Sequence, residues 1–227
     1  MWSSEVTNMI ITGIWETLYM TLVSTLVGYV IGLPMGIILT VSDKDGIKPN
    51  AVLYKILDVI ANIVRSVPFI ILLVLLIPFT RLVVRKSYGS PATFVPLVIA
   101  AAPYIARMVE SSLKEVDAGV IEAARSMGAS NFTIITKVML VEARTSLLVG
   151  ATITLGTILG YSAMSGAVGG GGLGAIAIRY GYTRWQTDIM IVTVILLIIL
   201  FQIFQTVGMK LADKFDHRTV SYTHLRA

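Results

Sequence analysis

Long stretches without Asp, Glu, Lys or Arg dominate this chain and leave it few possible folds. They cover residues 17–42, 66–80, 87–106, 145–178 and 189–209. A helix needs about 20 apolar residues to cross a bilayer, where only helices and closed barrels satisfy their backbone hydrogen bonds. The composition agrees with this constraint, because 56% of the 227 residues are hydrophobic and only 14% are charged. We predict an all-α, polytopic membrane protein with five transmembrane helices.

The second span is short by this measure, so its helix is expected to begin earlier, near Ile56. Asp58 and Arg65 would then lie at the membrane interface, where long side chains reach the headgroups. Pro68 and Pro78 are expected to bend this span.

The fourth span is too long for one simple crossing, and its second half is rich in glycine. Residues 162–177 read SAMSGAVGGGGLGAIA, in which helix is expected to give way to a close-packed turn at the outer side of the bundle. Gly169, Gly171 and Gly174 have the spacing of a dinucleotide-binding fingerprint. They lack its preceding strand and its acidic residue about 20 positions on, so we reject that interpretation.

Two further patterns predict helix packing. Gly28, Gly32 and Gly36 repeat every fourth residue, which favours close contact with another helix, either within the chain or in a second copy. Arg107 and Glu110, at the end of the third span, are close enough on a helix to form a structural ion pair.

The distribution of Lys and Arg predicts the orientation. Five spans put the termini on opposite sides, and Arg81, Arg85, Lys86, Arg179 and Arg184 lie on one side against twelve on the other, with Arg65 unassigned. The positive side faces the cytoplasm. The N-terminus is therefore expected outside, and the loop of residues 117–143 and the C-terminus inside.

That cytoplasmic loop is itself predicted to fold. Residues 117–143 read DAGVIEAARSMGASNFTIITKVMLVEA. Asp117 can cap a first helix that ends at Gly128, and Ser130 or Asn131 can cap a second. Ile134, Ile135, Val138 and Met139 then form an apolar stripe that can pack on neighbouring helix ends.

In this loop Glu122-Ala123-Ala124, three residues and Gly128 resemble the EAA loop in membrane subunits of bacterial ABC importers. Residues 15–37, 65–81, 102–113 and 160–174 are similar to the methionine-import permeases of the amino-acid class. The likeness covers about four-fifths of the chain. It departs from the family pattern where Val141 follows Leu140, because the EAA loop commonly ends in Leu-Pro.

The resemblance implies the mechanism and the partners. Glu122, Ala123, Ala124, Met127 and Gly128 would form a coupling helix that docks on a separate ATPase subunit, which uses ATP and Mg²⁺. A periplasmic or lipid-anchored binding protein would deliver D- or L-methionine to a homodimer of this chain in the bacterial inner membrane. The chain itself would bind no cofactor and would not be an enzyme.

The resemblance also places the fourth span beside the translocation path. Tyr161, Ser162, Met164 and Ser165 are the candidate lining residues, and helix packing alone explains them equally well. Their apolar and weakly polar character suits a small neutral amino acid.

Missing motifs narrow the alternatives. No phosphate-binding loop of the form G-x-x-x-x-G-K-[ST] occurs, so energy for uphill transport must come from another subunit. Basic residues form no dense patch for nucleic acid, and the chain lacks cysteine and zinc motifs. A stand-alone secondary transporter or channel remains an alternative. Residues 1–216 are expected to form the transmembrane domain, with 217–227 a disordered or non-native tail.

Overall fold

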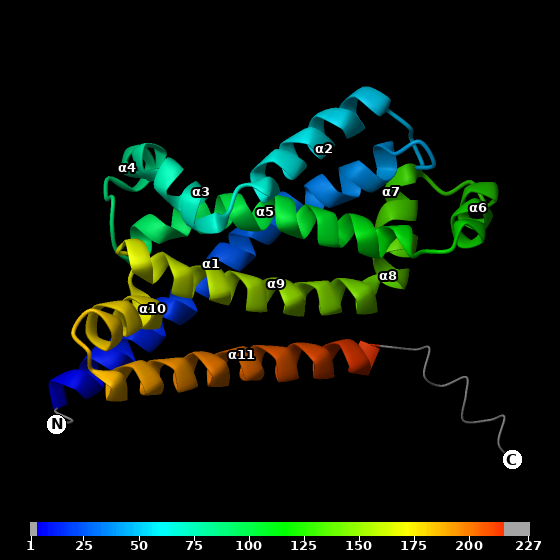
Figure 1. Cartoon of the computed structure of the whole chain (residues 1–227). Helices are drawn as coiled ribbons and strands as arrows, with labels where there is room; N and C mark the ends of the chain where they lie inside the picture. The colour runs from blue at the N-terminus through cyan, green and yellow to red at the C-terminus, as the bar shows by residue number, and fades with distance from the viewer. Residues whose placement is uncertain (1–3, 216–227) are drawn as a thin grey trace, which may run out of the picture.

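Helices make up nearly all of residues 4–215, the part of the chain that this computed structural model describes (Figure 1). The expected tail, residues 217–227, lies outside the described residues. The elements are α1 (Ser4–Ser42), α2 (Ala51–Ser66), α3 (Phe69–Leu75), α4 (Ile77–Val84), α5 (Ser90–Lys114), α6 (Ala118–Ser126), α7 (Asn131–Thr133), the π-helix η1 (Ile134–Met139), α8 (Leu140–Glu142), α9 (Arg144–Ser165), the 3₁₀-helix η2 (Gly166–Val168), α10 (Gly172–Ile176), the π-helix η3 (Ala177–Tyr182) and α11 (Thr187–Phe215).

The spans agree with the sequence prediction. Four helical segments in the described part are long and apolar enough to cross a membrane, and the bent pair α2 and α3 makes a fifth. The bend between α2 and α3 is 101°, and Pro68 is the N-cap residue of α3. Pro78 lies in the first turn of α4, where its missing amide proton costs no hydrogen bond within the helix. Helix α2 starts at Ala51, before the expected Ile56, because the Asn50 side chain accepts a hydrogen bond from the Leu53 amide and caps the helix.

Helix α5 is the centre of the bundle. In its most apolar window 72% of the residues are buried, against 11% for α11, which lies at the edge beside α9. Figure 1 shows α5, α9 and α11 running side by side, with α1 crossing behind them. Helix α6 projects at one end of these helices, and α10 lies near the other.

The glycine repeat of α1 packs on α5 within the same chain. A Cβ added at Gly32 would lie 2.5 Å from the Ala102 carbonyl oxygen and 2.8 Å from the Ile105 Cβ. Gly28 and Gly36 meet α5 one turn before and one turn after. The repeat therefore brings two backbones of one subunit together, as the packing interpretation predicted.

Replacing Gly32 by Val is expected to push α1 and α5 apart and to lower the free energy of unfolding by about 1–3 kcal/mol. Thermal unfolding of the purified chain in detergent measures the effect. Gly160→Ala is the control, because a Cβ at Gly160 meets nothing within 4 Å. Equal melting temperatures for the two variants would contradict the close contact.

A ladder of polar contacts joins α2 to the second half of α5. The Tyr54 hydroxyl donates a hydrogen bond to the Glu110 carboxylate at 3.2 Å. The Arg107 guanidinium forms ion pairs with two carboxylates, that of Glu110 at 2.6 Å and that of Asp58. Lys114 continues the ladder to Glu110 and to Asp43, in the loop after α1, at 2.8 and 2.7 Å. The predicted Arg107–Glu110 pair is thus confirmed as part of a larger network.

Asp43 makes this network sensitive to pH. The hydrogen bond from Lys114 lowers the pKa of the Asp43 carboxyl below its ordinary value, with a smaller contribution from Lys44. A lowered pKa stabilises the fold above the ordinary carboxyl range, and this stabilisation is lost as the pH falls through the pKa of the folded state.

Asp43→Asn is therefore expected to lower the melting temperature at pH 7 by about 1–3 °C, with a difference that shrinks toward pH 3. Asp45→Asn is the matched control, because Asp45 is highly exposed and lies 3.8 Å from Lys44 alone. A difference between wild type and Asp43→Asn that stays constant from pH 7 to pH 3 would show that the carboxylate charge is not involved.

Candidate functional site

The loop between α5 and α9, residues 117–143, is a folded unit that we call the coupling segment. Asp117 accepts a hydrogen bond from the Gly119 amide at 2.7 Å and begins α6. Ser130 accepts from the Thr133 amide at 3.2 Å and begins α7. Between them Gly128 has φ +79°, a conformation that glycine adopts without strain. The predicted pair of helices meeting at a glycine is confirmed.

One side of the coupling segment packs on the bundle. Ile134 and Met139 of η1 are buried in the core, together with Ala124 of α6, which is 5% exposed. The Arg125 guanidinium donates to the Ile47 carbonyl oxygen at 3.0 Å, which ties α6 to the loop after α1. The segment is therefore attached to several helices and can transmit a force to them.

Next to the side that holds Ala124, α6 is apolar and exposed. At 100° per residue, Val120, Ala123 and Met127 lie within about 60° of one another around the helix. Met127 is 82% exposed, and Phe132 at the start of α7 is 75% exposed. We call these four residues the exposed apolar face. Side chains of this size facing water indicate a surface made for a partner.

The structure separates the residues of the expected coupling motif. Glu122, Ala123, Met127 and Gly128 are exposed, whereas Ala124 contacts the core of its own chain. Sequence reasoning did not single out Val120 and Phe132. The spacing of Val120 three residues before Ala123 could have revealed the first, while only the fold shows that Phe132 is exposed.

The coupling segment leaves through a turn at Ala143. Helix continues through Val141, the position of the family's proline, and the backbone changes direction at buried Ala143, with φ −81° and ψ 0°. The Ser146 hydroxyl then donates to the Ser112 hydroxyl at 3.0 Å and holds α9 against α5. Val141 therefore does not disturb the exit of the segment.

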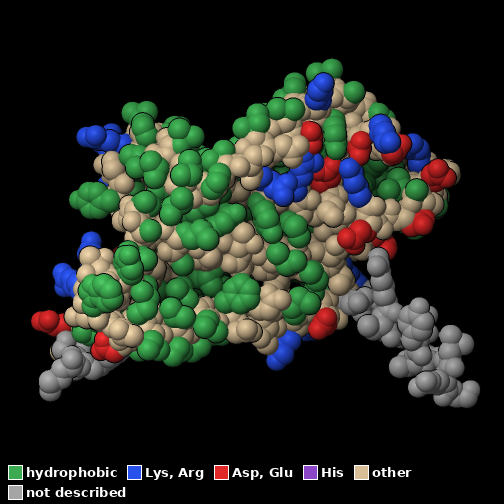
Figure 2. Space-filling view, viewed as in Figure 1, with side chains coloured by type: hydrophobic (Ala, Val, Ile, Leu, Met, Phe, Trp, Pro, Cys, Tyr) green, Lys and Arg blue, Asp and Glu red, His purple; other side chains and the backbone are tan. Residues whose placement is uncertain are grey.

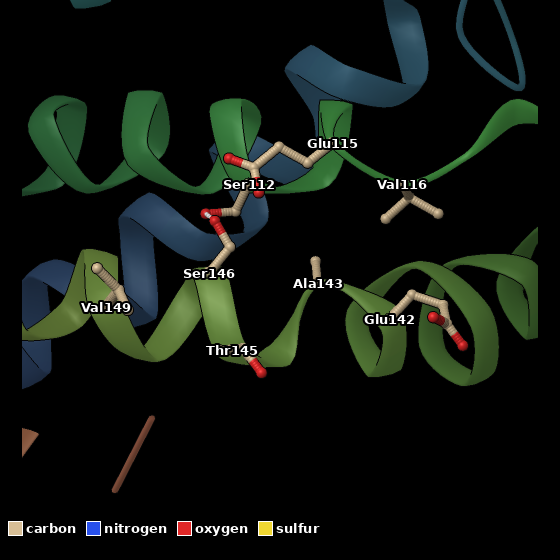
Figure 3. A pocket seen from close by; sticks show the side chains of 8 residues that line it. All are labelled: Ser112, Glu115, Val116, Glu142, Ala143, Thr145, Ser146 and Val149. Atoms are coloured by element: carbon tan, nitrogen blue, oxygen red, sulfur yellow. Dashed lines mark hydrogen bonds between the residues drawn. The ribbon is translucent and has the colours of Figure 1, made fainter. Parts of the chain in front are cut away.

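A pocket of about 230 Å³ lies beside this turn (Figure 3). In that view the carboxylates of Glu115 and Glu142 point away from each other. No group of three or more potential metal ligands occurs within residues 4–215. The pocket is a junction between helix ends with no sign of a metal centre.

At the other end of the bundle, side chains of α1 bind the backbone of the glycine run. The Glu16 carboxylate accepts from the Gly172 amide at 2.6 Å, and the Thr17 hydroxyl accepts from the Leu173 amide at 2.9 Å. Helix is interrupted at residues 169–171, a narrower break than expected, because these two side chains satisfy the amides that begin α10.

The glycine run also contacts α5 and borders a pocket. The Gly89 amide donates to the Gly169 carbonyl oxygen at 2.8 Å, and the Thr93 hydroxyl donates to the Gly170 carbonyl oxygen at 3.0 Å. The adjacent pocket has a volume of about 610 Å³ and is lined by Glu16 and Arg179 among others. The run is thus a fixed turn at the mouth of a depression whose lining is mainly apolar but includes these two charged side chains.

The four candidate lining residues of α9 fall into two groups. Ser162 and Ser165 are buried and donate to the carbonyl oxygens of Leu159 and Ser162, at 2.8 and 2.6 Å. Tyr161 stacks on Phe69 with ring centroids 4.5 Å apart, and Met164 is 53% exposed. In this conformation the serines support the helix, while Tyr161 and Met164 are the candidates that can reach a substrate.

Comparison with known proteins assigns the chain to a family. The family model described as the binding-protein-dependent transport system inner membrane component matches residues 32–220. The chain belongs to this family. As one of these permeases it is a multi-pass component of the inner membrane and a transport subunit, not an enzyme.

Individual relatives are similar over most of the permease. A probable D-methionine transport system permease protein, MetI, of Vibrio cholerae is 48% identical over 217 residues, which cover 96% of each chain. MetI of Escherichia coli K12 is 51% identical over 158 residues, covering 70% of this chain and 73% of its own.

Solved structures agree with the fold. A structure of inward-facing conformations of the MetNI methionine ABC transporter superimposes with a TM-score of 0.93 at 48% identity, covering 95% of this chain and all of that one. An amino acid ABC transporter crystallised with histidines has a TM-score of 0.71 at 21% identity, which shows a shared fold alone.

Gly128 offers a test of the coupling segment's shape. A Cβ there would meet nothing within 4 Å, so only the backbone conformation opposes a side chain. Gly128→Val is expected to destabilise the α6–α7 turn by about 1–2 kcal/mol and Gly128→Asn by less. Hydrogen exchange of the α6 amides should be faster in the Val variant. Equal exchange in both variants would mean that positive φ is not required.

Proposed function

We propose that the chain is the permease subunit of an ATP-driven importer for D- and L-methionine. The observation that carries this proposal is the coupling segment, which is anchored to the bundle yet presents an exposed apolar face. The names of the relatives, D-methionine transport permeases and a methionine ABC transporter, supply the substrate.

The motion driven by ATP would reach this chain through the exposed apolar face. The exposed apolar face would dock into a groove on a separate ATPase subunit. The exposed Glu122 carboxylate would pair with a basic group at the edge of that groove. ATP and Mg²⁺ would bind that subunit. Because α6 is tied to the loop after α1 and η1 to the core, closure of the ATPase would move the helix ends as rigid bodies.

The orientation follows from charge. The excess of Lys and Arg at the coupling end supports a cytoplasmic coupling segment and C-terminus, with the N-terminus outside. Figure 2 shows Lys, Arg, Asp and Glu side chains gathered around α6 and the neighbouring end of α2. The glycine run and its pocket would then face outward, where a periplasmic or lipid-anchored binding protein delivers substrate.

Two copies of the chain would enclose the path. Tyr161 and Met164 would line it, while Ser162 and Ser165 would hold the α9 backbone in shape. ATP binding would favour the outward-open arrangement of the two copies, and hydrolysis would return them to the inward-open one.

Ala123→Trp is the test of the coupling role. Its bulk on the exposed apolar face is expected to prevent docking, so that the ATPase subunit no longer co-purifies and ATP-driven uptake falls at least about 10-fold. Ala118→Trp is the matched control, because Ala118 is also exposed and lies about 140° around α6 from Ala123.

The control variant should retain the ATPase and transport methionine. Full uptake by Ala123→Trp would refute the docking surface. Uptake by vesicles that contain this chain alone, driven only by a methionine gradient, would instead support a secondary transporter and refute the importer.

A further inference from the structure

Helix α4 carries two arginines one turn apart that border the same pocket. Arg81 lies in the last turn of α4, and Arg85 is its C-cap residue. The pocket beside them has a volume of about 630 Å³. The other residues that line it are Ile77, Pro78, Leu82 and Ser87. Pro78 and Leu82 are also one turn apart, so the pocket has a row of cations and, next to it, a row of apolar side chains.

No carboxylate neutralises these two arginines. Both side chains are exposed, and no Asp or Glu within residues 4–215 forms an ion pair with either of them. The sequence contains no acidic residue at all from position 59 to position 109. Like charges one turn apart on a helix repel each other, which destabilises α4. An anion bound between the two guanidinium groups would remove this repulsion.

The backbone of Arg85 adds a second cost at the same place. Its φ of +59° and ψ of 17° lie in the left-handed region, which is unfavourable for a residue with a side chain. Glycine is the usual residue where a helix ends in this conformation. Strain of this kind concentrates at ligand sites, so an arginine in this position indicates a role for its guanidinium.

The pocket lies where the chain leaves an apolar layer. The charge-free stretch of residues 66–80 ends directly before Arg81. Figure 1 shows α4 at the same end of the bundle as α10, and Figure 2 shows Lys and Arg side chains beside apolar ones there. Leu82 is 82% exposed and Val83 is 58% exposed. In a permease of the inner membrane, arginines next to such side chains lie at the level of the lipid headgroups.

We propose that Arg81 and Arg85 bind the phosphate of an anionic phospholipid, whose acyl chains lie along Leu82 and Val83. A guanidinium matches phosphate oxygens with paired hydrogen bonds, and the Ser87 hydroxyl is a further donor at the pocket. The apolar row favours a lipid over a free phosphate, which would leave Leu82 uncovered. The bound lipid would hold α4 at the headgroup level. This site does not depend on which substrate the permease transports.

The absence of cysteine from the chain permits a local test. Val83→Cys is labelled with bimane, and the permease, in complex with a cysteine-free ATPase subunit, is reconstituted in bilayers of phosphatidylcholine. Brominated phosphatidylglycerol should quench the bimane with an apparent affinity at least about 5-fold above that of brominated phosphatidylcholine. In the double variant Arg81→Gln/Arg85→Gln this preference should fall below about 2-fold. Arg179→Gln is the matched control, because Arg179 is also exposed and lines a different pocket at the same end of the bundle.

Arg85→Gly separates lipid binding from folding. Because glycine adopts the left-handed conformation without strain, this variant should melt at the same temperature as the wild type or higher, while its preference for phosphatidylglycerol falls at least about 2-fold.

Three outcomes would overturn the proposal. The first is a preference for phosphatidylglycerol that survives in the double variant. The second is relief of the quenching by inorganic phosphate beyond that caused by chloride at equal ionic strength, which would show a site for free anions. The third is a bimane that neither brominated lipid quenches in the wild type, which would show that a protein surface, such as a second copy of the chain, covers the pocket.

Discussion

The contact between α1 and α5 supports both ends of the molecule. Because Gly28, Gly32 and Gly36 present no side chains, the two helices touch through their backbones along about two turns. The N-terminal half of α1 then reaches the glycine run, and the C-terminal half of α5 holds α2 and the loop after α1. A change in the tilt of either helix must therefore change the contacts at both ends of the molecule.

Much of this fold could be predicted from the sequence, because burial in lipid leaves a simple signal. Charge-free stretches located the spans, Pro68 located the bend, and Asp117, Gly128 and Ser130 located the helices of the coupling segment. The spans follow from the composition of a continuous stretch, and the bend and the helix ends are local effects of single residues on their own backbone.

What could not be predicted depends on contacts between distant parts of the chain. Glu16 and Thr17 limit the interruption of helix in the glycine run, yet no residue near the run in the sequence predicts these two partners. Ala123 and Ala124 are the same residue type, and only the packing of α6 shows that the first is exposed and the second lies in the core.

The hydrogen bonds from Gly172 and Leu173 to α1 span 156 residues of sequence. Synthesis proceeds at about 5–20 residues per second, so α1 leaves the ribosome roughly 8–30 s before its partners exist. During that interval the Glu16 carboxylate must stay hydrated or be shielded by another protein. The turn at the glycine run can form only after the fourth span has entered the membrane, which makes it one of the last parts of the permease to fold.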